Sequence, residues 1–262
     1  MILKESGSAL WQDGAMSSKC TAMLLAAGRG ERLRPLTDQT PKPLLNVRGM
    51  PLMQWAMQDL QRGGVRDLLI NTAWLGEQIP ARLGASLTHP ALPPMALHYS
   101  HEGADFGHAL ETAGGIVRAL PRLADVFWVA AGDVWAPGFD YRLDGAKSLL
   151  GPTALAHLWL VPRAAHTPDG DFGLDEAGRV LNCPAGDPRR QWTFSTIGLY
   201  RRALFEAPHQ ALPPGNPAGQ ALPLAPLLRA AMDQGLVRGT VWRGPWVDVG
   251  TPERLAALNA GA

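Results

Sequence analysis

Cysteines and long apolar runs are scarce in this sequence, and both shortages narrow the possible classes of protein. The two cysteines, Cys20 and Cys183, are too few for a disulfide framework or a four-thiolate zinc site. Reduced thiols are typical of proteins that work in the cytoplasm, which is the location we expect. No apolar run is long enough to span a bilayer, so we expect no membrane partner.

An excess of charge of one sign is also absent. The 24 Lys and Arg residues are balanced by 23 Asp and Glu residues, which leaves a formal net charge of +1. Such a chain has no basic field to attract a nucleic acid, and we expect no nucleic-acid partner. Residues 1–19 lack the apolar segment of an export signal and show no regular periodicity, so we expect a flexible N-terminal extension. Both a monomer and a homo-oligomer are compatible with the sequence.

Short apolar runs alternate with amphipathic segments through the first half of the chain. The pattern predicts strands at 21–27, 66–73, 95–99 and 126–131, and helices at 51–62, 74–83 and 110–120. The less regular second half predicts strands at 153–160, 192–200, 237–242 and 246–249, a hairpin at 171–181, and helices at 221–232 and after 251. This alternation indicates an α/β fold with a mixed, mostly parallel sheet flanked by helices.

A glycine-rich loop follows the first predicted strand, in the segment Leu25-Ala-Ala-Gly-Arg-Gly-Glu-Arg-Leu33. Glycines let the backbone approach a phosphate, and the guanidinium groups of Arg29 and Arg32 suit phosphate oxygens. The loop has neither the Gly-Lys-Ser/Thr of a Walker loop nor the third glycine of a dinucleotide fingerprint. Taken alone, it also fits an ordinary strand-to-helix turn.

Lys42 lies between two prolines in Thr40-Pro-Lys-Pro-Leu44, shortly after the glycine loop. The prolines restrict the backbone and hold the lysine on a stiff, extended segment. A positioned ammonium group can neutralise charge on a phosphoryl group during its transfer. A solvated lysine on a surface turn is the alternative for this motif alone.

Two aspartates in the predicted strand ends are candidate metal ligands. Asp133 comes directly after the apolar strand VFWVAA, and Asp248 lies within the apolar segment Trp246-Val-Asp-Val. A carboxylate in such surroundings needs a cationic partner, either a basic side chain or a metal. Because Mg²⁺ prefers one or two carboxylates together with phosphates and water, the pair favours a magnesium site beside a nucleotide. Taken singly, Asp133 also fits a turn residue and Asp248 a structural ion pair.

The order of the motifs is more specific than any one of them. The segments LAAGRGERLRPLT, TPKPLL, LETAGGI, AAGDVW and WVDVGTPERL resemble those of the nucleotidyltransferases that activate sugar 1-phosphates. The resemblance covers the chain from Thr21 onward. It implies a Rossmann-like core with a smaller inserted sugar-binding subdomain. We therefore expect one nucleotidyltransferase domain over 20–262, with 20–135 mainly binding the nucleotide and 136–262 mainly binding the sugar and supplying the second metal ligand.

The resemblance also implies a role for each matched residue. Asp133 and Asp248 would hold Mg²⁺, and Asp171 and Glu111 would bind the substrate. Charge neutralisation in catalysis would come from Lys42, Arg32 and Arg29. The nucleotide would be bound by Ala27, Gly28, Gly30, Glu31, Arg32, Lys42 and Gly114.

Within the family, the segments AWLGEQI, GDFGL and WTFS are similar to those of uridylyltransferases of bacterial cell-wall recycling. The expected substrates are therefore UTP and N-acetylmuramate α-1-phosphate. Glucose-1-phosphate thymidylyl transfer and mannose-1-phosphate guanylyl transfer are alternatives with the same chemistry. A nucleotide-binding regulatory domain without turnover is an alternative of another class, which predicts loss of Lys42 or of a metal carboxylate. All three of those residues are present.

Overall fold

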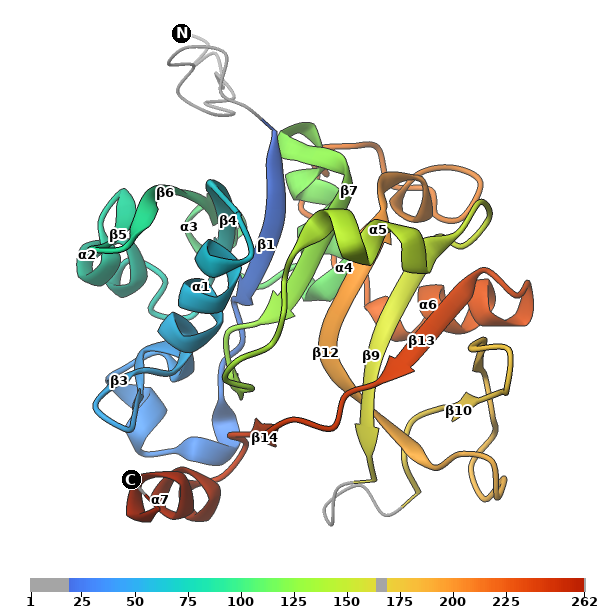
Figure 1. The fold of residues 1–262 in the computed structure, drawn as a ribbon. Helices are drawn as coiled ribbons and strands as arrows, with labels where there is room; N and C mark the ends of the chain where they lie inside the picture. Colours follow the sequence, from blue (N-terminus) through green and yellow to red (C-terminus); the bar gives the residue numbers. More distant parts are fainter. Residues whose placement is uncertain (1–18, 164–168, 262) are drawn as a thin grey trace, which may run out of the picture.

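The computed structural model describes residues 19–163 and 169–261, so almost all of the expected N-terminal extension lies outside the described residues. Within these ranges a central eight-stranded sheet has the order β13-β9-β12-β7-β1-β4-β6-β5 (Figure 1). Its strands are β1 Cys20–Ala26, β4 Asp67–Thr72, β5 Ser86–His89, β6 Leu92–His101, β7 Leu123–Ala131, β9 Ala156–Pro162, β12 Trp192–Arg201 and β13 Val237–Val241. The predicted α/β class is confirmed.

The sheet is mixed, with three parallel pairs in the first half of the chain and a further parallel pair, β13 with β9, in the second half. Strand β1 pairs in parallel with β4 and β7, and β4 pairs in parallel with β6. Strand β12 is antiparallel to β7, with Ile197 opposite Ala130. The first residues of β12, 192–196, therefore continue past the carboxyl end of β7. They bring the second half of the chain to the edge where β1, β4 and β7 end.

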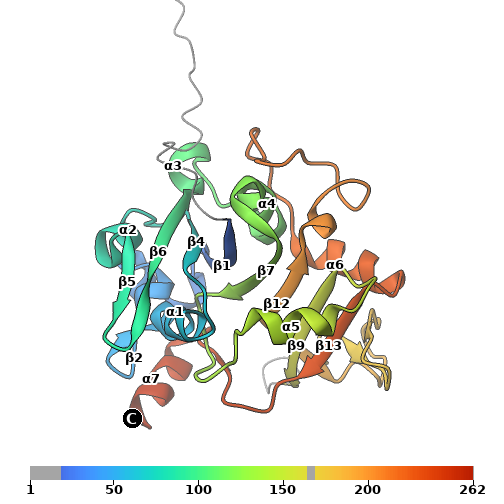
Figure 2. The ribbon, with the colours of Figure 1, turned by 45° about the horizontal axis from the view of Figure 1, so that its top comes forward.

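Helices cover both faces of this sheet, as Figures 1 and 2 show. On one face lie α1 Leu52–Arg62 and α5 Leu143–Leu150, above a core that includes Trp128, Phe139 and Trp159. On the other face, α4 Glu111–Ala119 and α6 Leu224–Asp233 pack on a core around Phe127 and Tyr200. The described residues contain no helix that is both long and apolar enough to cross a membrane.

Smaller elements connect these layers. They are the short 3-10 helices η1 Glu31–Leu33, η2 Leu36–Asp38, η3 Lys42–Leu44, η4 Leu120–Arg122 and η5 Arg202–Phe205, the helices α2 Gln78–Leu83 and α3 Glu102–Phe106, and the strand pairs β2 Asn46–Val47 with β3 Met50–Pro51, β8 Val134–Trp135 with β14 Val247–Asp248, and β10 Gly173–Leu174 with β11 Val180–Leu181. The β10–β11 pair confirms the hairpin expected at 171–181.

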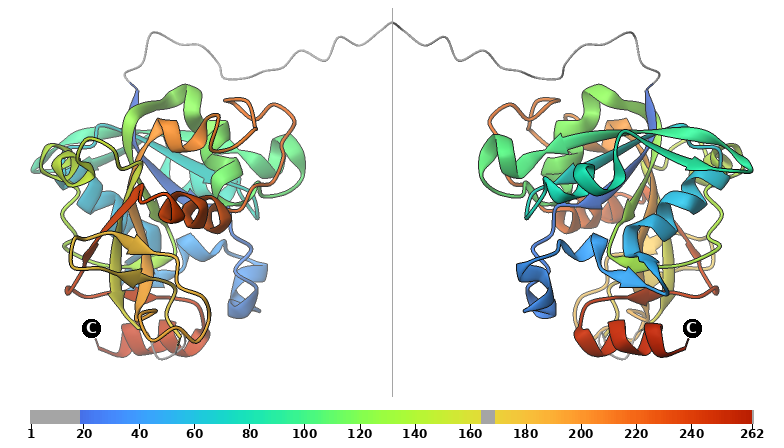
Figure 3. Two further views of the ribbon diagram at one scale, coloured as in Figure 1. Left: turned by 90° about the vertical axis from the view of Figure 1, so that its right-hand side faces the viewer. Right: turned by 90° about the vertical axis from the view of Figure 1, so that its left-hand side faces the viewer.

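The C-terminal segment packs against the first half of the chain. Strand β14 pairs antiparallel with β8, so Asp248 lies opposite Val134. Helix α7 Pro252–Ala260 follows, and the Thr251 hydroxyl accepts a hydrogen bond from the Arg254 N–H at 3.4 Å, as the N-cap pattern predicts. In Figures 1 and 3, α7 lies at the end of the molecule opposite the start of β1.

Candidate active site

The β8–β14 pairing brings the two predicted metal ligands to one place. The Lys42 ammonium lies 2.6 Å from Asp133 Oδ2 and 3.7 Å from Asp248 Oδ1. Only 8% of the Lys42 side chain is exposed, because η3 buries it beneath the glycine loop. A second cation meets Asp248, since Arg254 donates to its Oδ2 at 2.9 Å. The expected cationic partners of Asp248 are therefore present.

This arrangement fits a divalent cation bound with a triphosphate. Two carboxylates converge on one buried ammonium, and the Asp133 side chain is 39% exposed to the adjoining cleft. Within residues 19–163 and 169–261, no group of three or more His, Cys, Asp or Glu side chains is close enough together to hold a metal, and this pair of aspartates is no exception. A metal here would need phosphate or water oxygens besides Asp133 and Asp248, which is the way proteins usually hold Mg²⁺.

A cleft of about 1250 Å³ runs along the carboxyl ends of β1, β4 and β7. Such an edge is where open α/β sheets bind ligands. Among the predicted site residues, those lining the cleft are Ala27, Gly28, Arg29, Gly30, Glu31, Arg32, Lys42, Glu111, Asp133 and Asp171. Asp248 instead lines a smaller cavity beside Trp242 and Trp246.

The glycine loop is shaped by two different requirements. Gly30 has a φ of +67°, and a Cβ there would lie 3.0 Å from Thr37 and 3.1 Å from the Lys42 side chain. No larger residue fits this position without moving Lys42. Gly28 is exposed, and a Cβ there would meet nothing within 4 Å. The backbone at Gly28 is thus open to a ligand, whereas Gly30 serves the packing of the lysine.

The two arginines that we predicted to be catalytic have different surroundings. The Arg29 guanidinium lies 3.6 Å from the centre of the Trp74 ring and pairs with Asp38 at 2.9 Å. Hydrogen bonds from Arg29 and Arg34 lower the pKa of Asp38. Arg32 is exposed. Its NH2 group lies 3.1 Å from the position that a Cβ on Gly250 would occupy. Arg29 thus braces the loop, while Arg32 reaches toward the Asp248 segment.

Gly114, a predicted nucleotide contact, faces away from the cleft. Its N–H donates to the Leu222 carbonyl at 2.9 Å, and a Cβ there would lie 2.7 Å from the Gln220 carbonyl. The start of α4 instead presents Glu111 and Thr112 to the cleft. Glu111 has a φ of +60°, a strained conformation that is found preferentially at functional sites.

A buried carboxyl that sequence reasoning missed lies at the base of the cleft. Glu102 is fully buried; it accepts hydrogen bonds from Asn71 Nδ2 and the Leu110 N–H, each at 2.8 Å. Asn71 in turn accepts from the Ala26 N–H at 3.0 Å. Burial raises the pKa of Glu102. The network ties the end of β1 to the first turn of α4. The sequence hints at this role only by placing an acidic residue, Glu102, directly after strand β6.

The β12 side of the cleft carries Asp171 and Thr196. Asp171 Oδ2 accepts a hydrogen bond from the Phe194 N–H at 2.9 Å, which fixes the carboxylate at the rim. The register of β12 against β9 shifts between Phe194 and Gly198, and Thr196 there has a φ of +64°. This bulge turns Thr196 toward the cleft, which strand alternation could not predict.

Residues 21–144 match the Nucleotidyl transferase family. The chain is 44% identical over 241 residues to N-acetylmuramate alpha-1-phosphate uridylyltransferase of Neisseria meningitidis serogroup B, covering 91% of this chain and 96% of that protein. A protein of the same name from Caulobacter vibrioides is 27% identical over 243 residues, covering 91% and 95%.

Solved structures share the fold. The inositol-1-phosphate CTP transferase of T. maritima superposes with a TM-score of 0.64 over 94% of this chain and 98% of its own, at 17% identity. A Bacillus anthracis protein assigned as a glucose-1-phosphate thymidylyltransferase gives a TM-score of 0.71 at 21% identity, covering 92% and 94%. At these identities the likeness concerns the fold alone.

Proposed function

This chain belongs to the Nucleotidyl transferase family, and from that premise we propose that it transfers UMP from UTP to N-acetylmuramate α-1-phosphate, releasing pyrophosphate. The observation that carries the reaction class in the structure is the convergence of Asp133 and Asp248 on Lys42 beside an open glycine loop. The substrates are suggested by the 44% identity to the meningococcal uridylyltransferase across almost the whole of both chains.

The proposal divides the cleft between two substrates. Residues 20–135 hold the nucleotide, with the triphosphate over Gly28 and Arg32 and the base beside Glu111. Residues 136–262 hold the sugar, with a hydroxyl donating to Asp171, and supply Asp248 as the second metal ligand. The location of Asp171 on the β12 side of the cleft, away from the glycine loop, supports this division.

In the proposed reaction, a phosphate oxygen of the sugar 1-phosphate attacks the α-phosphorus of UTP. The new P–O bond forms as the bond from the α-phosphorus to the bridging oxygen breaks, and pyrophosphate leaves with that electron pair. The nucleophile is already anionic, so no general base is needed, and the protein acts by positioning and neutralising charge. Lys42 holds a fixed positive charge beside Asp133, and Arg32 adds a second positive charge from the exposed side of the loop.

We propose that Asp133 and Asp248 hold Mg²⁺ when the nucleotide is bound. The ion would supply charge neutralisation on the phosphate oxygens. Lys42 keeps the two carboxylates from repelling each other and fixes their orientation. Arg254 fixes Asp248 from the other side.

The test is pyrophosphate release from a panel of substrates. UTP, dTTP, GTP and CTP are each combined with the 1-phosphates of N-acetylmuramate, N-acetylglucosamine, glucose and mannose, with Asp133→Asn as the inactive control. We expect the highest kcat/KM with UTP and N-acetylmuramate α-1-phosphate. A higher value with dTTP and glucose 1-phosphate, or with GTP and mannose 1-phosphate, would contradict the proposed substrates.

A further inference from the structure

Arg229 is a basic side chain in the cleft that the proposed chemistry does not use. It lies on α6, whose residues Ala225, Leu228 and Arg229 line the cleft at the spacing of one helix face. The triphosphate side has Arg32 and Lys42 of its own. Arg229 therefore offers a separate positive charge within the same cavity.

The contacts of Arg229 assign it to the sugar side. Its guanidinium lies 5.2 Å from the centre of the Phe172 ring, and its NH1 donates to Asn182 Oδ1 at 2.6 Å. Phe172 follows Asp171, and Asn182 follows the β11 strand of the same hairpin. The residues that orient Arg229 thus belong to the part of the chain that we propose binds the sugar.

Among the described residues, the side chain that Arg229 donates to is the amide of Asn182, and no ion pair of Arg229 with a carboxylate is found. The acid nearest in this network, Asp233, accepts from Asn182 Nδ2 at 3.0 and 3.1 Å instead. The guanidinium is half-buried and held by an aromatic ring and one hydrogen bond. A planar fork fixed in this way has donors left over, and its preferred partner is a carboxylate or phosphate bound through two oxygens.

N-acetylmuramate differs from N-acetylglucosamine by a lactyl ether, which carries a carboxylate. We propose that Arg229 binds this carboxylate and is a specificity-determining residue for acidic sugar 1-phosphates. The inference rests on the proposed function, because it assumes that the sugar occupies the Asp171 side of the cleft. The two residues then have different roles: Asp171 accepts a hydrogen bond from a sugar hydroxyl, and Arg229 donates to the carboxylate of the substrate.

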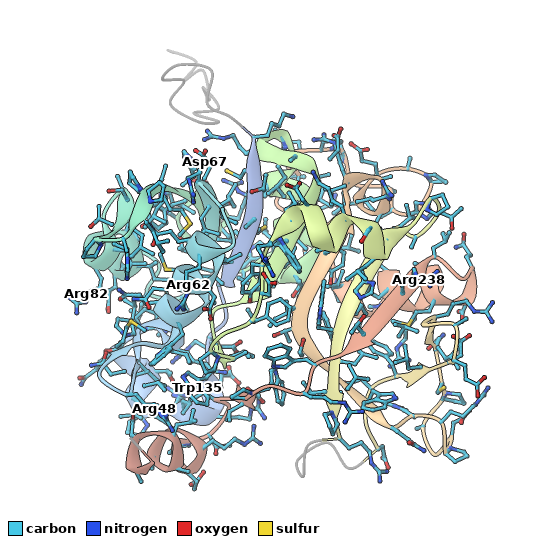
Figure 4. All side chains as sticks on the ribbon, viewed as in Figure 1. Arg48, Arg62, Asp67, Arg82, Trp135 and Arg238 are labelled. Atoms are coloured by element: carbon cyan, nitrogen blue, oxygen red, sulfur yellow. The ribbon has the colours of Figure 1, made fainter. Side chains whose placement is uncertain are left out.

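The test compares two ligands that differ only by the lactyl group. The KM and kcat are measured for N-acetylmuramate α-1-phosphate with UTP, and N-acetylglucosamine 1-phosphate is measured as a competitive inhibitor, so that its binding is read without turnover. The variants are Arg229→Met, which keeps the stem on Phe172, and Arg229→Lys, which keeps a charge without the fork. Arg82→Met is the matched control, since Arg82 lies on α2 at the periphery of the molecule (Figure 4).

We expect Arg229→Met to raise the KM for the acidic sugar by roughly 10- to 100-fold, as for loss of a charge-assisted hydrogen bond. Arg229→Lys should recover part of this loss, and the inhibition constant of N-acetylglucosamine 1-phosphate should stay within about twofold. Equal weakening of both ligands would show that Arg229 only ties α6 to the hairpin, and an unchanged KM would also overturn the inference. Failure of the unaltered enzyme to use the acidic sugar while it uses another would overturn the proposed function, and this inference with it.

Discussion

Lys42 separates two carboxylates that would repel each other without it, and it competes with any metal for them. We predict that Lys42→Met lowers turnover by roughly 10²- to 10³-fold, because a fixed positive charge beside the reacting phosphate is lost. The same change should leave Mn²⁺ binding to the free enzyme unchanged or tighter, since the competing ammonium is gone. Isothermal titration with Mn²⁺ measures this, with Lys147→Met on the exposed side of α5 as the control. Weaker Mn²⁺ binding would contradict the competition.

Asp133→Asn addresses the opposite partner in the same cluster. It keeps the size of the side chain and removes the charge that faces Lys42 and the cleft. We predict a loss of turnover of about 10³-fold or more and weaker Mn²⁺ binding, because an amide is a poorer ligand than a carboxylate. Activity near that of the unaltered enzyme at saturating Mg²⁺ would refute the metal assignment.

Glu102 links the stability of the fold to the shape of the cleft, because its buried carboxyl holds residues of two cleft-lining segments. Glu102→Ala leaves two buried donors, Asn71 Nδ2 and the Leu110 N–H, without their acceptor. We predict a fall of roughly 2–4 kcal/mol in the free energy of unfolding. The KM for UTP should rise as well, because the first turn of α4 loses its tie to β4. Urea unfolding and initial rates measure the two effects, and the exposed Glu77→Ala is the control. An unaltered urea midpoint would mean that other groups hold the turn.

Sequence reasoning at this scale works where function imposes a local pattern. The glycine loop, Lys42, Asp133 and Asp248 each lie in a recognisable segment, and the structure brings them together. Glu102, Thr196 and Arg229 have no such pattern. Their positions depend on a tertiary hydrogen-bond network, a β-bulge and a helix packed on a distant hairpin, respectively, and none of these is encoded by the residues next to them.

Strand β9 contains a buried histidine that makes a pH-dependent prediction. His157 is 2% exposed, its Nε2 lies 2.9 Å from the Thr240 hydroxyl of β13, and burial lowers its pKa from 6.5 to about 4. Between those pH values the unfolded chain binds a proton that the folded chain does not. Stability should therefore fall as the pH drops from 6.5 toward 4, by up to about 3 kcal/mol from this residue.

The comparison of His157→Gln with the unaltered protein isolates this contribution. The melting temperature is measured from pH 7.5 down to pH 4.5, and the decrease should be smaller in the variant. His89→Gln, at the exposed end of β5, should decrease as the unaltered protein does. Parallel curves for all three proteins would show that His157 does not couple folding to pH.

Some elements lie where the local sequence pattern did not predict them, because contacts with other parts of the chain decide their position. Strand β6 begins at Leu92, before the expected 95, although Pro93 and Pro94 would normally exclude a strand there. Its pairing with β4 begins only at Ala96, opposite Asp67, so on that side no partner needs the missing proline N–H groups. Helices α3 and α5, which were not predicted, are short segments whose placement depends on the packing around them.

At the scale of the whole molecule, the C-terminal helix keeps the second metal ligand in place. Arg254 of α7 donates to both the carbonyl and the carboxylate of Asp248. The helix is anchored by Arg48, which donates to the carbonyls of Leu258 and Gly261 at 3.2 and 3.1 Å and lies 4.7 Å from the Trp135 ring centre. Figure 4 shows Arg48 and Trp135 beside this helix.

We predict that Arg48→Met speeds hydrogen exchange of the α7 amides by about fivefold or more and weakens Mn²⁺ binding, because both anchoring bonds are lost. Exchange in β1 and β7 should not change. Hydrogen exchange read by mass spectrometry measures this, with Arg238→Met at the other side of the molecule as the control. Weaker Mn²⁺ binding with unchanged exchange in α7 would mean that Arg48 acts on the ion by another route.

The unbroken pairing of β12 with β7 has a consequence for inhibitor design. A single sheet joins the two walls of the cleft, so backbone hydrogen bonds between β12 and β7 help to set the distance between them. A compound that links a uridine mimic to an acidic sugar mimic through a rigid spacer of matched length would meet a receptor that is already shaped for it. Such a compound would gain affinity because neither it nor the cleft has to be ordered on binding. A flexible spacer would lose much of this gain, because its conformational entropy falls when it binds.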